Sequence, residues 1–200
     1  ALTFIGSNLL GIKQNDARRL LGYSSVGQIG LLMMIVGLSR YLGGQLTVIA
    51  YGIVISHSLA KAGMFWLAGI LQKDGLRDWA MLRKKPFMLA LFGTFIFALI
   101  GFPPFPSFFA KWELIMQLSS GAGFIWVAII LLGSLLEGVY LFRWLGYALK
   151  LDHQQLPAFS MSWNKILPVV LSGIALFVLG YFATPIAGGA TSIHFLPLGF

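Results

Sequence analysis

Long apolar runs, separated by short segments that carry most of the charge, dominate the pattern of this chain. The runs cover residues 1–12, 21–39, 46–71, 86–119, 121–149 and 166–183. A membrane-spanning helix needs about 20 apolar residues, so the second, third, fifth and sixth runs each predict one span. The alternation that barrel strands show is absent from these runs. The pattern therefore predicts an all-α, polytopic transmembrane helix bundle of about six spans.

The first run is too short to cross a bilayer. It also lacks an initiator methionine and the basic segment with which a signal peptide begins. We interpret it as the end of a helix that begins before Ala1. The chain is then expected to be the C-terminal portion of a longer protein, with residues 1–200 in a single transmembrane domain.

The fourth run predicts one discontinuous helix, because it is too long for one span and too short for two spans with a turn. Pro103, Pro104 and Pro106 remove amide donors and clash with the preceding helical turn. We expect the helix to stop near residues 101–102 and to resume after Ser107, whose hydroxyl could cap the second half. Such a break is tolerated at membrane depth only where protein or a wet cavity covers it.

Composition supports a membrane protein and removes several kinds of chemistry. Hydrophobic residues make up 58% of the chain and charged residues 10%, and the mean hydropathy is +0.85, well outside the range of soluble domains. The chain has no cysteine, which excludes disulfides, thiolate catalysis and cysteine-ligated iron–sulfur clusters.

The basic residues of the predicted loops lie almost entirely on one side of the membrane. That side holds Lys13, Arg18, Arg19, Lys73, Arg77, Arg83, Lys84, Lys85, Lys150 and Lys165. The opposite side holds Arg40. The positive-inside rule makes the basic side cytoplasmic and puts the C-terminus on the outer, periplasmic side. Because topology explains most of the net charge of +8, we expect no nucleic-acid partner.

Several ionisable residues lie inside the predicted spans, namely His57, Lys61, Lys111, Glu113, Glu137 and Arg143. A charge near the bilayer centre costs about 2.5–3.5 kcal/mol on insertion scales, so chance explains few of them. Lys61 and Glu137 fall near the middle of their runs. Lys111 lies eight residues before the end of its run, about 12 Å from the outer end at 1.5 Å per residue, so all three are predicted near the midplane. This common depth predicts a polar line that runs within the plane of the membrane.

Each of these residues also has a purely structural interpretation. His57 and Lys61 are four residues apart and share a helix face, which suits a proton relay but also a histidine bonded between helices beside a neutral lysine. Lys111 could snorkel or fill space at the break. Glu137 could form a structural ion pair, with a counter-charge from another helix.

Glu113 and Arg143 carry weaker functional signals. Glu113 could face a neighbouring subunit or the outer interface. Arg143 could reach towards the cytoplasmic interface. Their roles stay open.

Three motifs carry a resemblance to a known family. They are NDARRLLGYSSVGQIG at residues 15–30, SHSLAKAGMF at 56–65 and GFPPFPSFFAKWELI at 101–115. Their order and spacing resemble the antiporter-like proton-translocating subunits of respiratory complex I, which are related to Mrp-type cation/proton antiporters and membrane-bound hydrogenases. The third motif is the most specific, because it combines glycine, paired prolines, an aromatic stretch and a lysine.

The resemblance implies an architecture and roles for individual residues. The chain would correspond to the last six of the family's usual fourteen helices, an inverted repeat plus a flanking C-terminal helix. Lys111 matches the charged residue of the discontinuous helix, taken as the terminal donor to the exit path, and Lys61 matches the central lysine, with His57 beside it. Glu137 has no family counterpart, and its place in the relay rests on depth alone.

The resemblance implies a proton-translocating subunit of a redox-driven pump, with the proline break, Pro103, Pro104 and Pro106, as its gate. Such a subunit is not catalytic itself and holds no cofactor. Its partners would be other membrane subunits, the lipid bilayer and H⁺, with Na⁺ as an alternative ion. It would lie in a bacterial or archaeal cytoplasmic membrane or an organellar inner membrane.

Two other kinds of transporter and one redox protein compete with this interpretation. An Mrp-type Na⁺/H⁺ antiporter subunit shares the motifs. A secondary solute transporter also places a broken helix beside a midplane charge. A di-haem membrane cytochrome needs paired intramembrane histidines, whereas His57 lies in a span and His153 and His194 lie outside the spans.

Overall fold

A computed structural model describes residues 1–119, 123–150 and 163–188, with side chains described as far as residue 183. The elements are α1 (Leu2–Ile12), α2 (Ala17–Gly37), α3 (Ser39–Leu42), η1 (Gly43–Gln45), α4 (Leu46–Leu71), η2 (Leu76–Lys84), α5 (Pro86–Ile100), α6 (Pro106–Ser119), α7 (Phe124–Leu149) and α8 (Trp163–Gly188). The described residues contain helices and 3₁₀ turns and no strand, so the predicted all-α class is confirmed.

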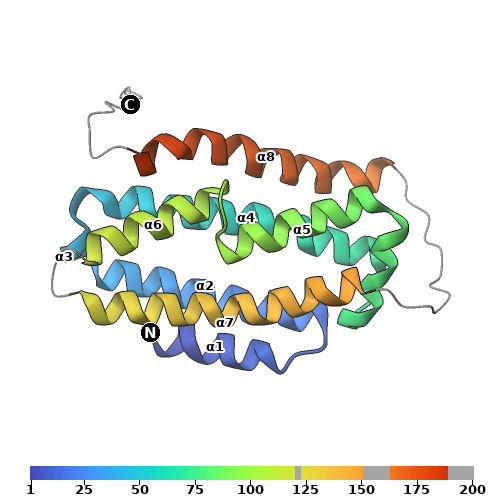
Figure 1. Cartoon of the computed structure of the whole chain (residues 1–200), viewed down its shortest axis with the longest axis horizontal. Helices are drawn as coiled ribbons and strands as arrows, with labels where there is room; N and C mark the ends of the chain where they lie inside the picture. Colours follow the sequence, from blue (N-terminus) through green and yellow to red (C-terminus); the bar gives the residue numbers. More distant parts are fainter. Residues whose placement is uncertain (120–122, 151–162, 189–200) are drawn as a thin grey trace.

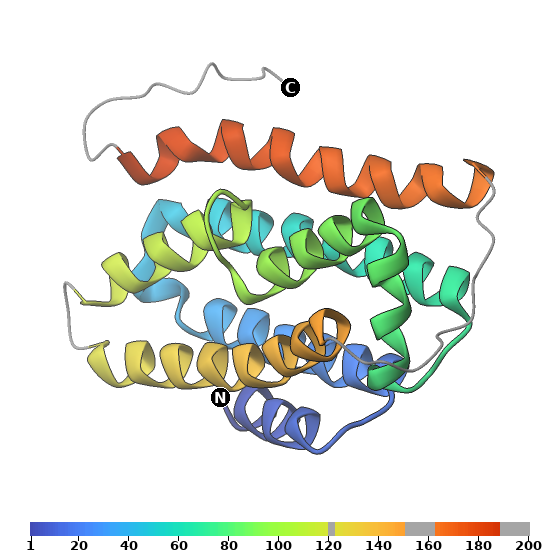
Figure 2. The same cartoon turned by 45° about the vertical axis from the view of Figure 1, so that its right-hand side comes forward.

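The helices run along one common axis (Figure 1). α8 lies at the top of that view, above α4 and the consecutive pair α5 and α6, followed by α2 and α7, with the short α1 at the bottom. The same order is visible in the rotated view of Figure 2. The bundle therefore places α2, α4, α6 and α7 around its interior.

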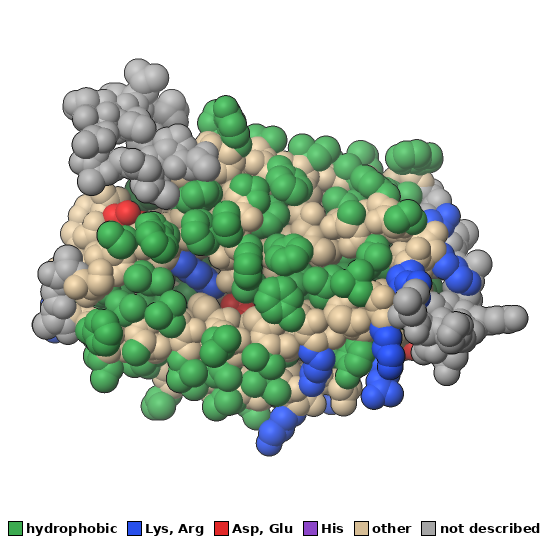
Figure 3. All heavy atoms as spheres, in the orientation of Figure 1, with side chains coloured by type: hydrophobic (Ala, Val, Ile, Leu, Met, Phe, Trp, Pro, Cys, Tyr) green, Lys and Arg blue, Asp and Glu red, His purple; other side chains and the backbone are tan. Residues whose placement is uncertain are grey.

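Within the described residues, four helical segments are long and apolar enough to cross a membrane. They are Ala17–Gly37, Ser39–Leu71, Phe124–Leu149 and Trp163–Ala183. α1 and α5 are shorter apolar helices, and α5 and α6 follow each other end to end, as the broken-span prediction requires. Apolar side chains cover most of the outer face in Figure 3, as expected where lipid replaces water.

The predicted break is confirmed, but its capping differs from the expectation. α5 ends at Ile100, and Gly101 adopts φ 90°, a left-handed conformation that favours glycine. α6 begins at Pro106, so Ser107 lies inside it and does not precede it. The expectation that Ser107 caps α6 is wrong, because its hydroxyl donates to the carbonyl of Ala98 at 2.7 Å. Ser107 thus satisfies the end of α5.

The segment that contains Arg77, Arg83 and Lys84, predicted as a charged loop, is folded into the bundle. η2 buries Trp79 completely, and the Trp79 ring contacts Phe92 and Trp144 with centroid distances of 5.0 and 4.5 Å. The loop before η2 is joined to the start of α2 by an antiparallel bridge between Asp16 and Gly75. These contacts close the end of the bundle where the predicted cytoplasmic loops lie.

Two apolar clusters fill the bundle, one towards each end. On α2, Leu20 and Leu21 belong to the first cluster and Leu31 to the second. On α7, Ile130 belongs to the second cluster and Leu141 to the first. The helix segments between the two clusters carry buried polar side chains, among them Ser24, Ser56 and Glu137. Apolar packing at both ends thus leaves a polar layer in the middle.

Candidate functional site

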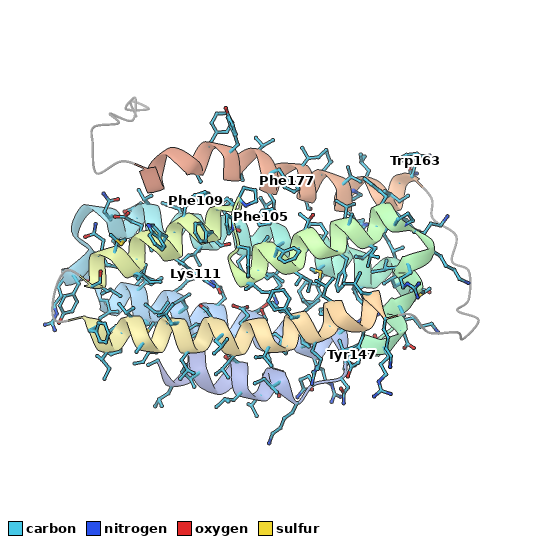
Figure 4. The ribbon with its side chains drawn as sticks, in the orientation of Figure 1. Phe105, Phe109, Lys111, Tyr147, Trp163 and Phe177 are labelled. Carbon is cyan, nitrogen blue, oxygen red and sulfur yellow. The ribbon has the colours of Figure 1, made fainter. Side chains whose placement is uncertain are left out.

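Three buried charged side chains lie in this polar layer, on three different helices. Lys61 on α4, Lys111 on α6 and Glu137 on α7 are 6%, 7% and 1% exposed. Figure 4 shows Lys111 pointing from α6 towards α7, close to the break between α5 and α6. The face drawn in Figure 3 has a blue and a red group side by side at its centre, surrounded by apolar side chains.

Lys111 bonds to the end of the broken helix. Its Nζ donates to the carbonyl oxygen of Ile100, the last residue of α5, at 3.0 Å. The last carbonyls of a helix lack intrahelical partners and carry the negative end of its dipole, so they attract a cation. A Cβ on Gly101 would lie 3.2 Å from Lys111 Cδ, so the lysine passes close to the backbone of the break.

Glu137 supplies the counter-charge from another helix. Its Oε2 lies 3.9 Å from Lys111 Nζ, and its Oε1 accepts a 2.8 Å hydrogen bond from the hydroxyl of Ser24 on α2. Oε2 has no hydrogen-bond partner among the described residues. Within that part of the chain Glu137 is also the one buried carboxylate. One buried carboxylate therefore lies in a layer with two buried lysines and pairs with Lys111.

Lys61 reaches the same site through α2. Its Nζ donates to the carbonyl oxygen of Leu21 at 2.6 Å. Leu21 and Ser24 are three residues apart and therefore neighbours on one face of α2. One turn of α2 thus joins Lys61 to Glu137, and the order along the site is Lys61, the α2 turn, Glu137 and Lys111.

His57 lies one turn before Lys61 on α4 and is half-buried. Its Nε2 is a buried atom that makes no hydrogen bond with the described residues, as is the hydroxyl oxygen of Ser56 next to it. A buried polar atom without a partner loses the hydration it had in water, so each of these atoms would be stabilised by a polar partner. His57 therefore extends the polar layer along α4.

Glu113 and Arg143 lie outside the site. Glu113 accepts a 2.7 Å hydrogen bond from the side chain of Gln117, one turn further along α6. Arg143 donates to the backbone carbonyls of Ile12 and Gln14 at the end of α1. Arg143 thus reaches the loop that the charge pattern makes cytoplasmic, and it fixes α7 to that loop.

The proline segment is held from outside by α8. Pro103 and Pro104 are exposed and Pro106 is buried. A Cβ on Gly180 of α8 would lie 2.0 Å from the carbonyl oxygen of Pro104, so the two backbones touch. Phe105 also packs on Phe177, with a centroid distance of 5.3 Å; both residues are labelled in Figure 4. α8 thus covers one side of the break, where Phe105 and the Pro104 carbonyl lie against it.

Sequence analysis missed the hydroxyl and amide groups of the site. Ser24 contacts Glu137 directly, and the Tyr140 hydroxyl donates to Asn8 Oδ1 on α1 at 2.9 Å, both partners being buried. These polar residues lie within apolar runs, and that position is the sequence feature from which a role in the site could have been predicted. No group of three or more potential metal-binding side chains occurs in the described part of the chain.

Residues 1–137 match the transmembrane family described as NADH:quinone oxidoreductase/Mrp antiporter, TM. The chain belongs to this family. This match confirms the resemblance found in the three motifs. It also supports an integral membrane protein of the complex I antiporter-like type, in agreement with the apolar helices of spanning length.

Curated relatives of this family are much longer than the chain. It is 31% identical over 197 residues to NADH-quinone oxidoreductase subunit N of Desulforudis audaxviator, covering 88% of this chain and 38% of the relative. It is 27% identical over 191 residues to NADH-quinone oxidoreductase subunit N 2 of a Hydrogenobaculum species, covering 90% and 40%. The chain therefore spans about two fifths of the length of these relatives.

A solved structure has the same fold. A chain of respiratory complex I from Thermus thermophilus superposes with a TM-score of 0.69 at 22% identity, over 94% of this chain and 43% of that chain. At this level of identity the likeness concerns the fold.

Proposed function

We propose that this chain is the C-terminal part of an antiporter-like subunit that moves protons in a complex I-type assembly, with the energy supplied by redox chemistry in other subunits. The proposal rests on the position of Lys111. This buried lysine lies between the Glu137 carboxylate and the carbonyl of Ile100 at the end of α5. The family and the names of the relatives support the assembly type.

The charge balance of the site favours exchange of a proton. Two buried lysines, Lys61 and Lys111, share one buried carboxylate, and Glu137 attracts both of them. A buried charge without a partner costs several kcal/mol. The site therefore stabilises one lysine cation beside Glu137 better than two, and a proton that reaches one lysine favours release from the other.

Coulomb energies at this scale are large enough to drive such a response. Two unit charges about 4 Å apart interact by about 4 kcal/mol at an effective dielectric of about 20. The separation of Lys111 Nζ and Glu137 Oε2 is 3.9 Å. In this mechanism His57 loads Lys61, Glu137 is shared between the lysines, and Lys111 passes its proton to the outer side at the Pro103–Pro106 break.

The subunit itself would hold no cofactor, and its partners would be other membrane subunits, the bilayer and H⁺. Its C-terminus would lie on the outer side. The alternative is an Mrp-type antiporter subunit that transports Na⁺, and the test has to distinguish it from a proton-translocating subunit.

Replacement of Lys111 by Met in the full-length subunit tests the proposal. The assembled complex, reconstituted in vesicles, should oxidise its donor but pump fewer protons per electron, measured in sodium-free and sodium-containing buffer. Lys13→Met, an exposed lysine outside the site, is the matched control. Normal pumping by an assembled Lys111→Met complex contradicts the proposal, and a defect confined to sodium transport supports the antiporter alternative.

A further inference from the structure

A groove unrelated to the charged site runs between α4 and the beginning of α8. Its volume is about 530 Å³, and it is lined by Ala62, Phe65, Trp66, Gly69, Ile70 and Lys165. It lies at the end of the bundle where α8 begins, which Trp163 marks in Figure 4. Lysine and arginine side chains gather at the same end in Figure 3.

The groove arises from small residues on one face of α4. Ala62 and Gly69 are two helical turns apart and lie on the same side of the helix. A Cβ on Gly69 would meet nothing within 4 Å, so the space beside it is open. Phe65 and Trp66 form the walls and are 46% and 50% exposed. The result is an apolar recess open to the outside of the bundle.

Trp66 fixes the shape of this recess. Its indole Nε1 donates to the backbone carbonyl of Lys165 at 2.8 Å. This bond satisfies the polar group of the indole and joins α4 to the first turn of α8, while the ring remains as apolar wall. The groove is therefore held by a hydrogen bond between its two helices and does not depend on an occupant.

Lys165 adds a positive charge at the rim. Its side chain is exposed and forms no ion pair with the described residues. It lies at the end of the bundle that the charge pattern makes cytoplasmic, where the membrane leaflet carries anionic lipids. An apolar recess and a cation at its interfacial end match the two parts of a phospholipid.

We propose that this groove binds one anionic phospholipid, with an acyl chain along α4 from Ile70 towards Ala62 and the phosphate at Lys165. The span from Ile70 to Ala62 is about 12 Å at 1.5 Å per residue, against about 15 Å for half of the hydrocarbon core. One leaflet therefore contains the whole groove.

Labelling with lipids tests this site. The assembled complex with the full-length subunit is placed in phosphatidylcholine vesicles that contain either photoactivatable phosphatidylglycerol or photoactivatable phosphatidylcholine, and labelled peptides are mapped by mass spectrometry. We expect phosphatidylglycerol to label residues 62–70 several-fold more than phosphatidylcholine. Lys165→Gln should remove that preference, whereas the control Lys73→Gln, an exposed lysine at the same end, should keep it.

A second variant separates the apolar from the charged part of the site. Gly69→Leu should fill the groove and reduce labelling by both lipids while Lys165 is intact, because the added side chain enters open space. Equal labelling by the two lipids in the unmodified complex contradicts the proposal that Lys165 selects an anionic lipid. No labelling of residues 62–70 overturns the proposal and indicates that a neighbouring subunit covers the groove.

Discussion

The ammonium of Lys111 on α6 faces the carboxylate of Glu137 on α7 at 3.9 Å, and both residues are almost completely buried. Lys111 also bonds to the carbonyl of Ile100 at the end of α5. The lysine therefore has two anionic or dipolar partners, one from a side chain and one from the broken backbone. These surroundings suit an ammonium group that gives up its proton when a second positive charge enters the site.

Loss of the Glu137 carboxylate should reduce proton transfer through both buried lysines. We predict that Glu137→Gln lowers proton pumping per electron and destabilises the subunit, because removal of one partner of a buried pair costs about 3–5 kcal/mol where the other charge remains. Pumping in vesicles and the melting temperature of the assembled complex are the measurements. Glu113→Gln is the matched control, since Glu113 bonds within α6 and lies outside the site. Equal effects of the two variants would argue against a special role of Glu137.

Ser24 should influence proton pumping through its hydrogen bond to Glu137. Its hydroxyl donates a 2.8 Å bond to the carboxylate, and bonds to charged groups contribute about 1.5–3 kcal/mol. We predict that Ser24→Ala reduces pumping less than Glu137→Gln does, and that it has little further effect when combined with Glu137→Gln. Ser172→Ala removes a hydroxyl that bonds to its own helix α8, and it should leave pumping unchanged. Additive losses in the Ser24 and Glu137 double variant would contradict the link.

Contact with α8 should control the position of the break. A Cβ at Gly180 would lie 2.0 Å from the Pro104 carbonyl oxygen, so Gly180→Ala has to displace backbone. Overpacking of this kind costs about 1–3 kcal/mol. We predict a lower melting temperature and reduced pumping, whereas Gly146→Ala, at a glycine with open space around it, should be neutral. Unchanged pumping by Gly180→Ala would show that the break tolerates displacement.

The two lysines should act as one path. We predict that the double variant Lys61→Met and Lys111→Met pumps no worse than the more impaired single variant, because both lysines depend on Glu137. The measurement is a double-mutant cycle on protons pumped per electron in assembled complex. Losses that multiply independently would show that the lysines serve separate routes.

Much of the fold follows from the sequence because lipid imposes simple requirements. The run at residues 46–71 predicts α4 with both ends correct, since an apolar run of spanning length has helix as its stable form in a bilayer. Pro103, Pro104 and Pro106 predict the break for a local reason, the loss of amide donors. The predicted common depth of Lys61, Lys111 and Glu137 follows from counting residues along each run. These features depend on single helices, so no knowledge of neighbours is needed.

The neighbours themselves were decided by tertiary structure. Nothing local assigns Glu137 to Lys111 and Ser24, or Lys61 to the carbonyl of Leu21, because those partners come from other helices. η2 read as a charged loop, yet it buries Trp79 because α5 and α7 present aromatic rings to it. Ser107 looked like a helix cap, but the folded chain brings it next to the unpaired carbonyl of Ala98.

The sequence by itself therefore determined which segments form apolar helices and where along each helix the charged residues lie, because both follow from the length and polarity of each run. Only the packing of α2, α4, α6 and α7 decided which of the buried polar groups meet. Helix association in lipid depends on close backbone approach and on polar pairs between helices. Both are properties of the assembled bundle, such as the contact of Gly180 with Pro104 and the pairing of Lys111 with Glu137.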